Sequence, residues 1–372
     1  MRLLFAVFRP SQLFTSISMA KIFTRGTCDI LVMKTGMHFE QWENLSEFLN
    51  DFNKSLRVDF AFSKNPVNWI KRTQQIRSLS EMISDRYNGL ILFSDQSVII
   101  RSIVSNINRM KVKLGLVEDG AVVYSDSRRK NTISGVIKSI LLKNKIILDR
   151  GYGECFLTDS ALMSFSCHKN ILARDITVLG FPLFSGSAIY LRDRLDLPTH
   201  VYSKASFIST PLATDRFNIS FEKVRSMLDI LASKHEIERK NIAYYPHPSE
   251  NKDQTRYFRM SGFEIINERC NIPVENILIR NHQINPQLFI AGIESSALYN
   301  LSWVLDTKIV SFAGILGIDL GTVFHASPIA VPSNIDSLCN SDEGAKNVEL
   351  SSGITDLDFE SGIRRFFSSL FG

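Results

Sequence analysis

Three tripeptides, spaced widely along the chain, carry side chains suited to acid–base chemistry. They are Glu118-Asp119-Gly120, Pro246-His247-Pro248 and Glu294-Ser295-Ser296. Each follows a hydrophobic run typical of a buried strand, and open α/β folds bind their ligands at the carboxyl ends of strands. Together they supply a carboxylate base, an imidazole donor and a pair of hydroxyls. These groups suit the displacement of a phosphate from a sugar by an acceptor hydroxyl.

The first tripeptide offers two carboxylates at adjacent positions. Side chains of adjacent residues on an extended backbone point in different directions, so one of Glu118 and Asp119 can accept a proton while the other bonds the loop or the sugar. Gly120 permits a sharp turn and a close approach of substrate. Asp-Gly is also a common turn dipeptide, so a plain turn is the alternative interpretation.

The second tripeptide places one imidazole between two prolines, after the strand-like run 241–245. The prolines restrict the backbone on both sides of His247. A histidine held in this way can donate a proton or a charge-assisted hydrogen bond to a departing phosphate, with Pro248 completing the substrate loop. The alternative is a turn histidine whose neighbouring prolines only set the turn geometry.

The third tripeptide lies at a predicted strand-to-helix junction. The hydroxyls of Ser295 and Ser296, with the free N–H groups of a helix start, suit the phosphate of a nucleotide sugar. Gly292 just before them would let a ligand come near. The alternative is that Ser295 only caps the helix.

Short apolar runs alternate with longer amphipathic ones along the chain. This alternation predicts βαβ units and parallel sheets, whose strand ends would position the candidate residues. In the first half we expect strands at 3–8, 28–33, 57–62, 89–93 and 111–117, and helices at 10–23, 40–53, 66–86 and 96–110. Residues 146–200 show no clear pattern. In the second half we expect strands at 201–208, 241–245, 263–266, 286–291 and 308–312, and helices at 219–236, 251–260, 273–280 and from Ser295.

This pattern predicts an α/β chain with two Rossmann-like domains. We place the amino-terminal domain at 1–197 and the carboxyl-terminal domain at 198–352. The tail 353–372 has an amphipathic end that predicts a helix packing back on a domain, with a peripheral membrane contact as the alternative. At 372 residues the chain exceeds the size at which one core usually stops growing, which also favours two domains.

Composition and charge exclude several classes of protein. The net charge of +5 comes from 43 basic and 38 acidic residues, too small an imbalance to indicate nucleic-acid binding. The five cysteines show no CxxC pairing, so we expect buried thiols in a reducing compartment rather than disulfides or a zinc site. An apolar amino terminus interrupted by Arg9 and Pro10 reads as a strand rather than a signal peptide. Without a membrane-spanning run, the sequence predicts a cytoplasmic protein, at most peripheral to the inner membrane.

Motifs that are absent narrow the class further. The sequence contains no GxxxxGK[ST], GxGxxG, HExxH or GxSxG, which argues against the common ATPases, dehydrogenases, zinc proteases and serine hydrolases. The D-x-D at Asp356-Leu357-Asp358 lies outside the strand–loop framework, and we interpret it as surface. No metal and no cofactor are therefore expected.

The three tripeptides, in this order, resemble the signature of bacterial sialyltransferases with the GT-B architecture. This group includes the lipooligosaccharide sialyltransferases of glycosyltransferase family 52 and the capsular polysialyltransferases. Their pattern is an acidic pair with Gly in the first domain, a His-Pro in the second, and a Ser-Ser or Ser-Thr pair further on. The loop Arg9-Pro10-Ser11-Gln12-Leu13 also resembles the opening of family members, which implies that Ser11 and Gln12 contact the substrate. The resemblance therefore spans about residues 1–312.

The resemblance implies a GT-B fold with two domains facing across a cleft, and an inverting, metal-independent transfer of sialic acid from CMP-sialic acid to a lipooligosaccharide or capsular glycan. Asp119 or Glu118 would be the base, His247 would assist the leaving nucleotide, and Ser295 and Ser296 would hold it. Some members are thought to draw their base from the start of the second domain, which makes Asp215 a rival. A GT-B transferase using CMP-Kdo or a UDP-sugar, and a non-catalytic glycan- or nucleotide-binding protein, remain as alternatives.

Overall fold

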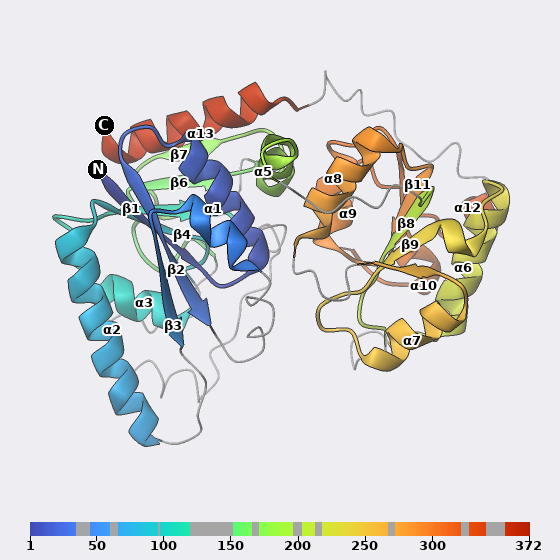
Figure 1. Cartoon of the computed structure of the whole chain (residues 1–372), viewed down its shortest axis with the longest axis horizontal. Helices are drawn as coiled ribbons and strands as arrows, with labels where there is room; N and C mark the ends of the chain where they lie inside the picture. Colours follow the sequence, from blue (N-terminus) through green and yellow to red (C-terminus); the bar gives the residue numbers. More distant parts are fainter. Residues whose placement is uncertain are drawn as a thin grey trace. The chain divides into compact units, whose positions relative to one another are not determined.

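The computed structural model describes residues 1–34, 45–59, 66–95, 97–119, 152–165, 171–195, 203–212, 218–266, 272–320, 327–339 and 354–372. The chain forms two compact units (Figure 1). Met1–Leu183 together with Asp356–Gly372 make the first, and Phe184–Thr355 make the second. The boundary expected between residues 197 and 198 lies outside the described residues.

The first unit is built on a seven-stranded sheet in the order β3-β2-β1-β4-β5-β6-β7, and all neighbouring strands are parallel. The strands are β1 (Arg2–Val7), β2 (Thr27–Lys34), β3 (Lys54–Asp59), β4 (Gly89–Leu92), β5 (Lys113–Val117), β6 (Ser160–Met163) and β7 (Ile176–Val178). Residues 3–7 are almost wholly buried. Such continuous apolar runs are typical of parallel strands covered on both faces.

Helices cover both faces of this sheet (Figure 1). They are α1 (Pro10–Ile22), α2 (Pro66–Arg86), α3 (Val98–Asn106) and α13 (Asp356–Phe371). On one face α2 and α3 share a core with Leu4 and Ala6 of β1. On the other, α13 contacts α1, β5, β6 and β7. The close approach needs Gly115, where an added Cβ would lie 2.7 Å from the Phe366 ring. The tail therefore belongs to the first core.

The second unit is built on a five-stranded parallel sheet in the order β10-β9-β8-β11-β12. Its strands are β8 (Ala205–Ile208), β9 (Ile242–Tyr245), β10 (Glu264–Ile265), β11 (Phe289–Gly292) and β12 (Lys308–Ser311). Its helices are α5 (Leu183–Leu191), α6 (Phe221–Lys234), α7 (Lys252–Met260), α8 (Val274–Ile284), α9 (Ser296–Ser302), α10 (Ala313–Leu316) and α12 (Ile335–Cys339), with the 3-10 helix η4 (Arg239–Asn241).

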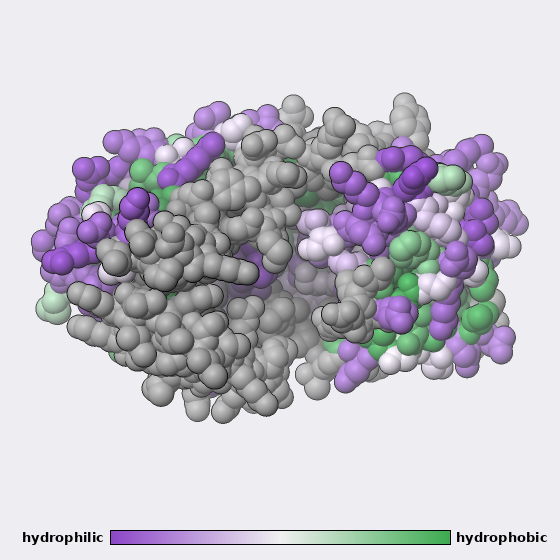
Figure 2. Space-filling view, turned by 90° about the horizontal axis from the view of Figure 1, so that it is seen from below, coloured by the Kyte–Doolittle hydropathy of each residue, from purple (hydrophilic) through white to green (hydrophobic). Residues whose placement is uncertain are grey.

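Aromatic side chains account for much of the second core. The rings of Tyr244 and Phe258 stack with their centroids 4.6 Å apart, and Phe207 stacks on Phe258 and Phe312. On the face drawn in Figure 2, hydrophilic residues of this unit border a smaller hydrophobic area. Stacked aromatic rings therefore lie at the centre of the second core.

One predicted helix is wrong. Residues 40–53 were expected to be helical, but where they are described they form only a short 3-10 helix, η2 (Glu47–Asp51). Strand pairing begins at Asn53, whose N–H donates to the Cys28 carbonyl at 2.9 Å and whose amide donates to Asp29. This pairing with β2 ends the helix early and starts β3 at Lys54 instead of residue 57.

Both sheets reverse their strand order at one point. The reversal lies between β1 and β4 in the first unit and between β8 and β11 in the second. Ligands of open α/β sheets bind outside the carboxyl ends of the strands at such a point. The expectation of two parallel Rossmann-like units is confirmed, and the loops after β1, β5, β8, β9 and β11 are where the candidate residues lie.

Candidate functional site

Asp119 follows β5 and is oriented by a glutamine from α1. Gln12 Nε2 donates to Asp119 Oδ1 at 2.7 Å, while Gln12 Oε1 accepts the Phe8 N–H at 2.7 Å. The other oxygen, Asp119 Oδ2, lies 3.9 Å from Arg9 Nη1. The Asp119 side chain keeps 18% of its surface exposed. A carboxylate that is oriented by a hydrogen bond and remains partly exposed can act as a general base.

Glu118 points the other way and is buried at 2% exposure. Its two oxygens accept hydrogen bonds from Ser164, one from the backbone N–H at 2.6 Å and one from the hydroxyl at 2.7 Å. The Ser164 hydroxyl in turn accepts the Leu183 N–H at 2.8 Å. Glu118 therefore ties the end of β5 to the segment after β6.

Three further candidate residues belong to the predicted site, namely Ser11, Gly120 and Asp215. Ser11 lies half-buried in the first turn of α1. Gly120 and the rival base Asp215 lie outside the described residues.

His247 lies on the exposed loop after β9, between half-buried Pro246 and exposed Pro248. The Ser249 N–H donates to His247 Nδ1 at 3.1 Å. The Glu250 N–H donates to the His247 carbonyl at 2.9 Å, which closes a tight turn. Because Nδ1 accepts a hydrogen bond, the proton of the neutral ring lies on Nε2. The imidazole is therefore set up as an Nε2–H donor.

Glu250 lies beneath this loop and was missed by the sequence reasoning. Its carboxylate accepts four hydrogen bonds, from Ser209 Oγ (2.5 Å), Tyr244 Oη (2.8 Å), Thr255 Oγ1 (2.8 Å) and the His247 N–H (3.2 Å). Burial raises the pKa of the Glu250 carboxyl, while the hydroxyl donors and the His247 N–H oppose that shift. Burial and the neighbouring Glu250 also raise the pKa of the Tyr244 phenol, which keeps it a donor.

Gln254 joins this network to the loop after β8. Its Nε2 lies within hydrogen-bond distance of Ser209 Oγ (2.9 Å), the Thr210 carbonyl (2.9 Å) and Tyr244 Oη (3.1 Å). Its Oε1 accepts the Leu212 N–H at 2.9 Å. Loops from two adjacent strands, β8 and β9, are thus held together by buried polar side chains.

Ser295 and Ser296 lie at the start of α9, after β11. Ser295 is the N-cap, and its hydroxyl accepts the Ala297 N–H at 3.2 Å, as the capping alternative predicts. Ser296 is exposed. The Thr210 hydroxyl donates to the Glu294 carbonyl at 3.1 Å, so this loop lies next to the loop after β8, across the reversal of strand order.

Gly292 lies where α9 packs closely against β11 and β8. An added Cβ would lie 2.8 Å from Leu298 Cδ1 and 2.9 Å from the Ile208 carbonyl oxygen. The space beside its Cα is therefore already filled by α9 and β8. Its lack of a side chain is explained by this close contact of helix and strand.

The sequence does contain a signal for Glu250. His247 and Glu250 stand three residues apart directly before Asn251, whose side chain caps α7 by accepting the Gln254 N–H at 2.8 Å. A carboxylate between a turn and a helix cap is usually exposed to solvent, so the neighbouring residues in the sequence do not indicate that Glu250 is hydrogen-bonded inside the protein. Ser209 and Thr210, which directly follow β8, are a second indication in the sequence, because two polar residues at a buried strand end need hydrogen-bond partners.

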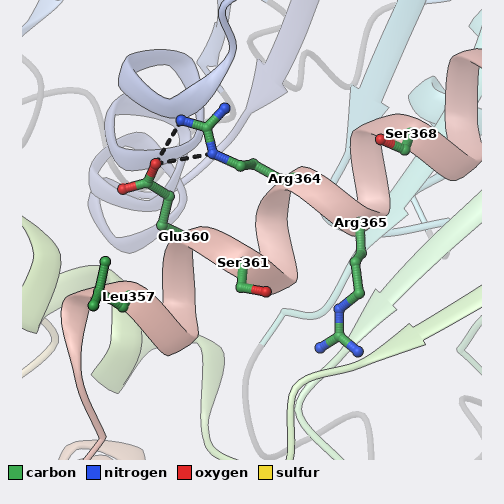
Figure 3. Close-up of a pocket in the computed structure, with 6 residues that line it drawn as sticks. All are labelled: Leu357, Glu360, Ser361, Arg364, Arg365 and Ser368. Carbon is green, nitrogen blue, oxygen red and sulfur yellow. Dashed lines mark hydrogen bonds and ion pairs between the residues drawn. The ribbon is translucent and has the colours of Figure 1, made fainter.

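A shallow pocket of about 480 Å³ lies elsewhere, on the outward face of α13 (Figure 3). Arg364 forms an ion pair with Glu360 one turn away, and Arg365 points away from that pair. The remaining described lining residues are Leu357, Ser361 and Ser368. This pocket contains no residue of the three tripeptides.

Among the described residues, no group of three or more His, Cys, Asp and Glu side chains is placed to hold a metal ion. In the same part of the chain, no helix has the length and apolar character needed to cross a membrane.

No protein-family model and no curated protein sequence matches the chain. Solved structures do match. UDP-GlcNAc 2-epimerase from Methanocaldococcus jannaschii has a TM-score of 0.60 at 11% identity, covering 99% of this chain and 100% of that one. The same enzyme in complex with UDP-GlcNAc and UDP has a TM-score of 0.55 at 11% identity, covering 100% of both chains.

A Listeria monocytogenes structure described as a UDP-N-acetylglucosamine 2-epimerase has a TM-score of 0.57 at 12% identity, covering 99% of this chain and 94% of that one. At such identities the similarity shows the fold alone. The chain has the GT-B type of fold, with two Rossmann-like domains.

Proposed function

We propose that the protein is a glycosyltransferase that uses a nucleotide sugar, with Asp119 as its base and His247 as the donor to the leaving phosphate. One observation carries the proposal. At the strand ends where such folds bind ligands, the first sheet presents a carboxylate fixed by Gln12, and the second presents an imidazole fixed as an Nε2–H donor.

The proposed reaction is a single inverting displacement. The acceptor oxygen forms a bond to the anomeric carbon as its proton passes to Asp119. The bond from that carbon to the phosphate oxygen breaks, and its electron pair stays on the phosphate. His247 Nε2–H hydrogen-bonds this oxygen as its charge develops, and Ser296 and Ser295 contact the phosphate. Such a site acts chiefly by positioning and charge, and the reaction as written uses no metal.

For the donor we propose CMP-sialic acid, and for the acceptor a hydroxyl of a lipooligosaccharide or capsular glycan. The support is the resemblance of the three tripeptides, in order, to the bacterial sialyltransferase signature. An acceptor carried on a lipid would bring the protein to the inner membrane face.

The second candidate is an enzyme acting on a UDP-sugar. The support is that the matched structures described above are UDP-GlcNAc 2-epimerases, one of them holding UDP-GlcNAc and UDP. This candidate would use the same fold and the same strand-end loops with a different nucleotide. A non-catalytic nucleotide- or glycan-binding protein differs from both in predicting that His247 and Asp119 are dispensable.

Calorimetric titration of the purified protein with CMP, UMP, UDP and ADP distinguishes the CMP-linked donor from the UDP-linked one. We expect CMP to bind most tightly, and His247→Ala to weaken its binding without changing the unfolding temperature. Tighter binding of UDP than of CMP would favour an enzyme that acts on a UDP-sugar. Equal, weak binding of all four nucleotides would count against a nucleotide site altogether.

A further inference from the structure

We propose that Glu250 is a positioning residue that holds His247 in the Nε2–H form facing the substrate. The inference rests on the proposed function, in which His247 contacts the leaving phosphate. Glu250 would not contact the substrate itself and would act only by positioning His247.

The Glu250 carboxylate is held in place by hydroxyl groups. Three hydroxyls donate to it from three different segments: Ser209 after β8, Tyr244 in β9 and Thr255 in α7. Ser209 and Tyr244 are themselves buried and hydrogen-bonded to Gln254. An acceptor held by three fixed donors has little freedom to turn. The Glu250 carboxylate is thus a rigidly held acceptor next to the exposed loop that carries His247.

The fourth hydrogen bond of the Glu250 carboxylate restrains the backbone of His247. Glu250 Oε2 accepts the His247 N–H at 3.2 Å, and the Glu250 N–H donates back to the His247 carbonyl at 2.9 Å. Both polar groups of the His247 backbone are therefore bound to one residue. The backbone orientation of His247 decides where its ring can lie, since the rotamers of a side chain depend on its φ and ψ.

The His247 ring is oriented by a hydrogen bond within the same turn. The Ser249 N–H donates to His247 Nδ1 at 3.1 Å within the turn of residues 247–250, which the Glu250 N–H closes and the Glu250 carboxylate supports by accepting the His247 N–H. An isolated hydrogen bond between residues two apart on an exposed loop competes with water and contributes little by itself. Without the carboxylate we expect the ring to sample both neutral tautomers. Of the two neutral tautomers, only Nε2–H makes Nε2 the donor that a developing phosphate charge needs.

The experiment compares Glu250→Ala and Glu250→Gln with a matched control, Thr255→Val. The control removes one anchoring hydroxyl from the carboxylate but leaves its bond to the His247 backbone. The first readout is the ¹⁵N NMR spectrum of histidine-labelled protein, with the His247 signals assigned from a His247→Asn variant. The second is turnover of CMP-sialic acid, resolved into kcat and KM.

We expect the Nε2–H tautomer in wild type and in Thr255→Val, a mixture in Glu250→Ala, and an intermediate population in Glu250→Gln, which keeps one acceptor oxygen. We expect kcat to fall by about 10- to 100-fold in Glu250→Ala, with a smaller change in KM, since the lost interaction acts in the transition state. A folded Glu250→Ala protein that keeps the Nε2–H tautomer would overturn the inference. If that variant does not fold, a wild-type tautomer and wild-type kcat in Glu250→Gln would overturn it equally.

The positioning role of Glu250 and the proposed glycosyltransferase function can be refuted independently. The NMR readout tests the positioning of His247 whether or not the protein turns over any nucleotide sugar. Absence of turnover in wild type, with the tautomer shift still present in Glu250→Ala, would reject the proposed function and leave Glu250 as the residue that sets the state of His247.

Discussion

The two adjacent carboxylates, Glu118 and Asp119, should respond to mutation in opposite ways. Glu118 is buried with both oxygens bound to Ser164, whereas Asp119 is partly exposed and oriented by Gln12. We therefore expect Glu118→Gln to lower stability and Asp119→Asn to lower activity. The amide replacements match the carboxylates in size, so each variant changes charge and hydrogen bonding alone.

The size of the stability effect follows from the Ser164 contacts. A glutamine can still accept the Ser164 N–H and donate to the Ser164 hydroxyl oxygen, so two charge-assisted hydrogen bonds become two neutral ones. Each such exchange costs about 1 kcal/mol, so the free energy of unfolding of the first unit should fall by about 2 kcal/mol. For a unit of this size that corresponds to a fall of about 4–8 °C in the unfolding temperature.

Asp119→Asn should leave stability nearly unchanged. The asparagine oxygen still accepts the Gln12 amide, and the ion pair lost to exposed Arg9 is worth less than about 1 kcal/mol. Loss of the base should lower kcat/KM by about 10²- to 10⁴-fold. Differential scanning calorimetry and an initial-rate assay on both variants check the pair. A stable, inactive Glu118→Gln beside an active Asp119→Asn would refute the assignment of roles.

Three further predictions concern packing, thiol chemistry and metals. Gly292→Ala should destabilise the second unit by about 1–3 kcal/mol in urea unfolding, because the added Cβ meets the Ile208 carbonyl and Leu298; unchanged stability would contradict the close contact. Burial and the Asp29 charge raise the pKa of the Cys28 thiol to about 12, so iodoacetamide should label Cys28 only after unfolding, as read by peptide mass spectrometry. Dialysis against EDTA should leave turnover unchanged, and a loss restored by Mg²⁺ or Mn²⁺ would contradict the proposed chemistry.

The elements that the sequence predicted well are those with strong local signals. The helix 66–86 has the predicted bounds, and the strand-like runs before Glu118, His247 and Glu294 are β5, β9 and β11. Their hydrophobic period and flanking turns are local properties. The helix expected at 40–53 failed because pairing of Asn53 with β2 is a tertiary contact.

The candidate site was predictable only in part, because the roles of its side chains depend on distant partners. Nothing near Glu118 indicates that Ser164, 46 residues later, holds it in the interior. Likewise the anchor of Glu250 comes from Ser209, 41 residues earlier. The sequence placed His247 on the right kind of loop, while the residue that orients it became visible only in three dimensions.

Turnover of CMP-sialic acid with a galactose-terminated acceptor, in wild type and His247→Ala side by side, tests the central claim most directly. We expect wild type to release CMP and form the sialylated product, and the variant to be slower by about 10²- to 10⁴-fold at unchanged unfolding temperature. Wild-type turnover in His247→Ala, or conversion of a UDP-sugar in place of CMP-sialic acid, would contradict the claim.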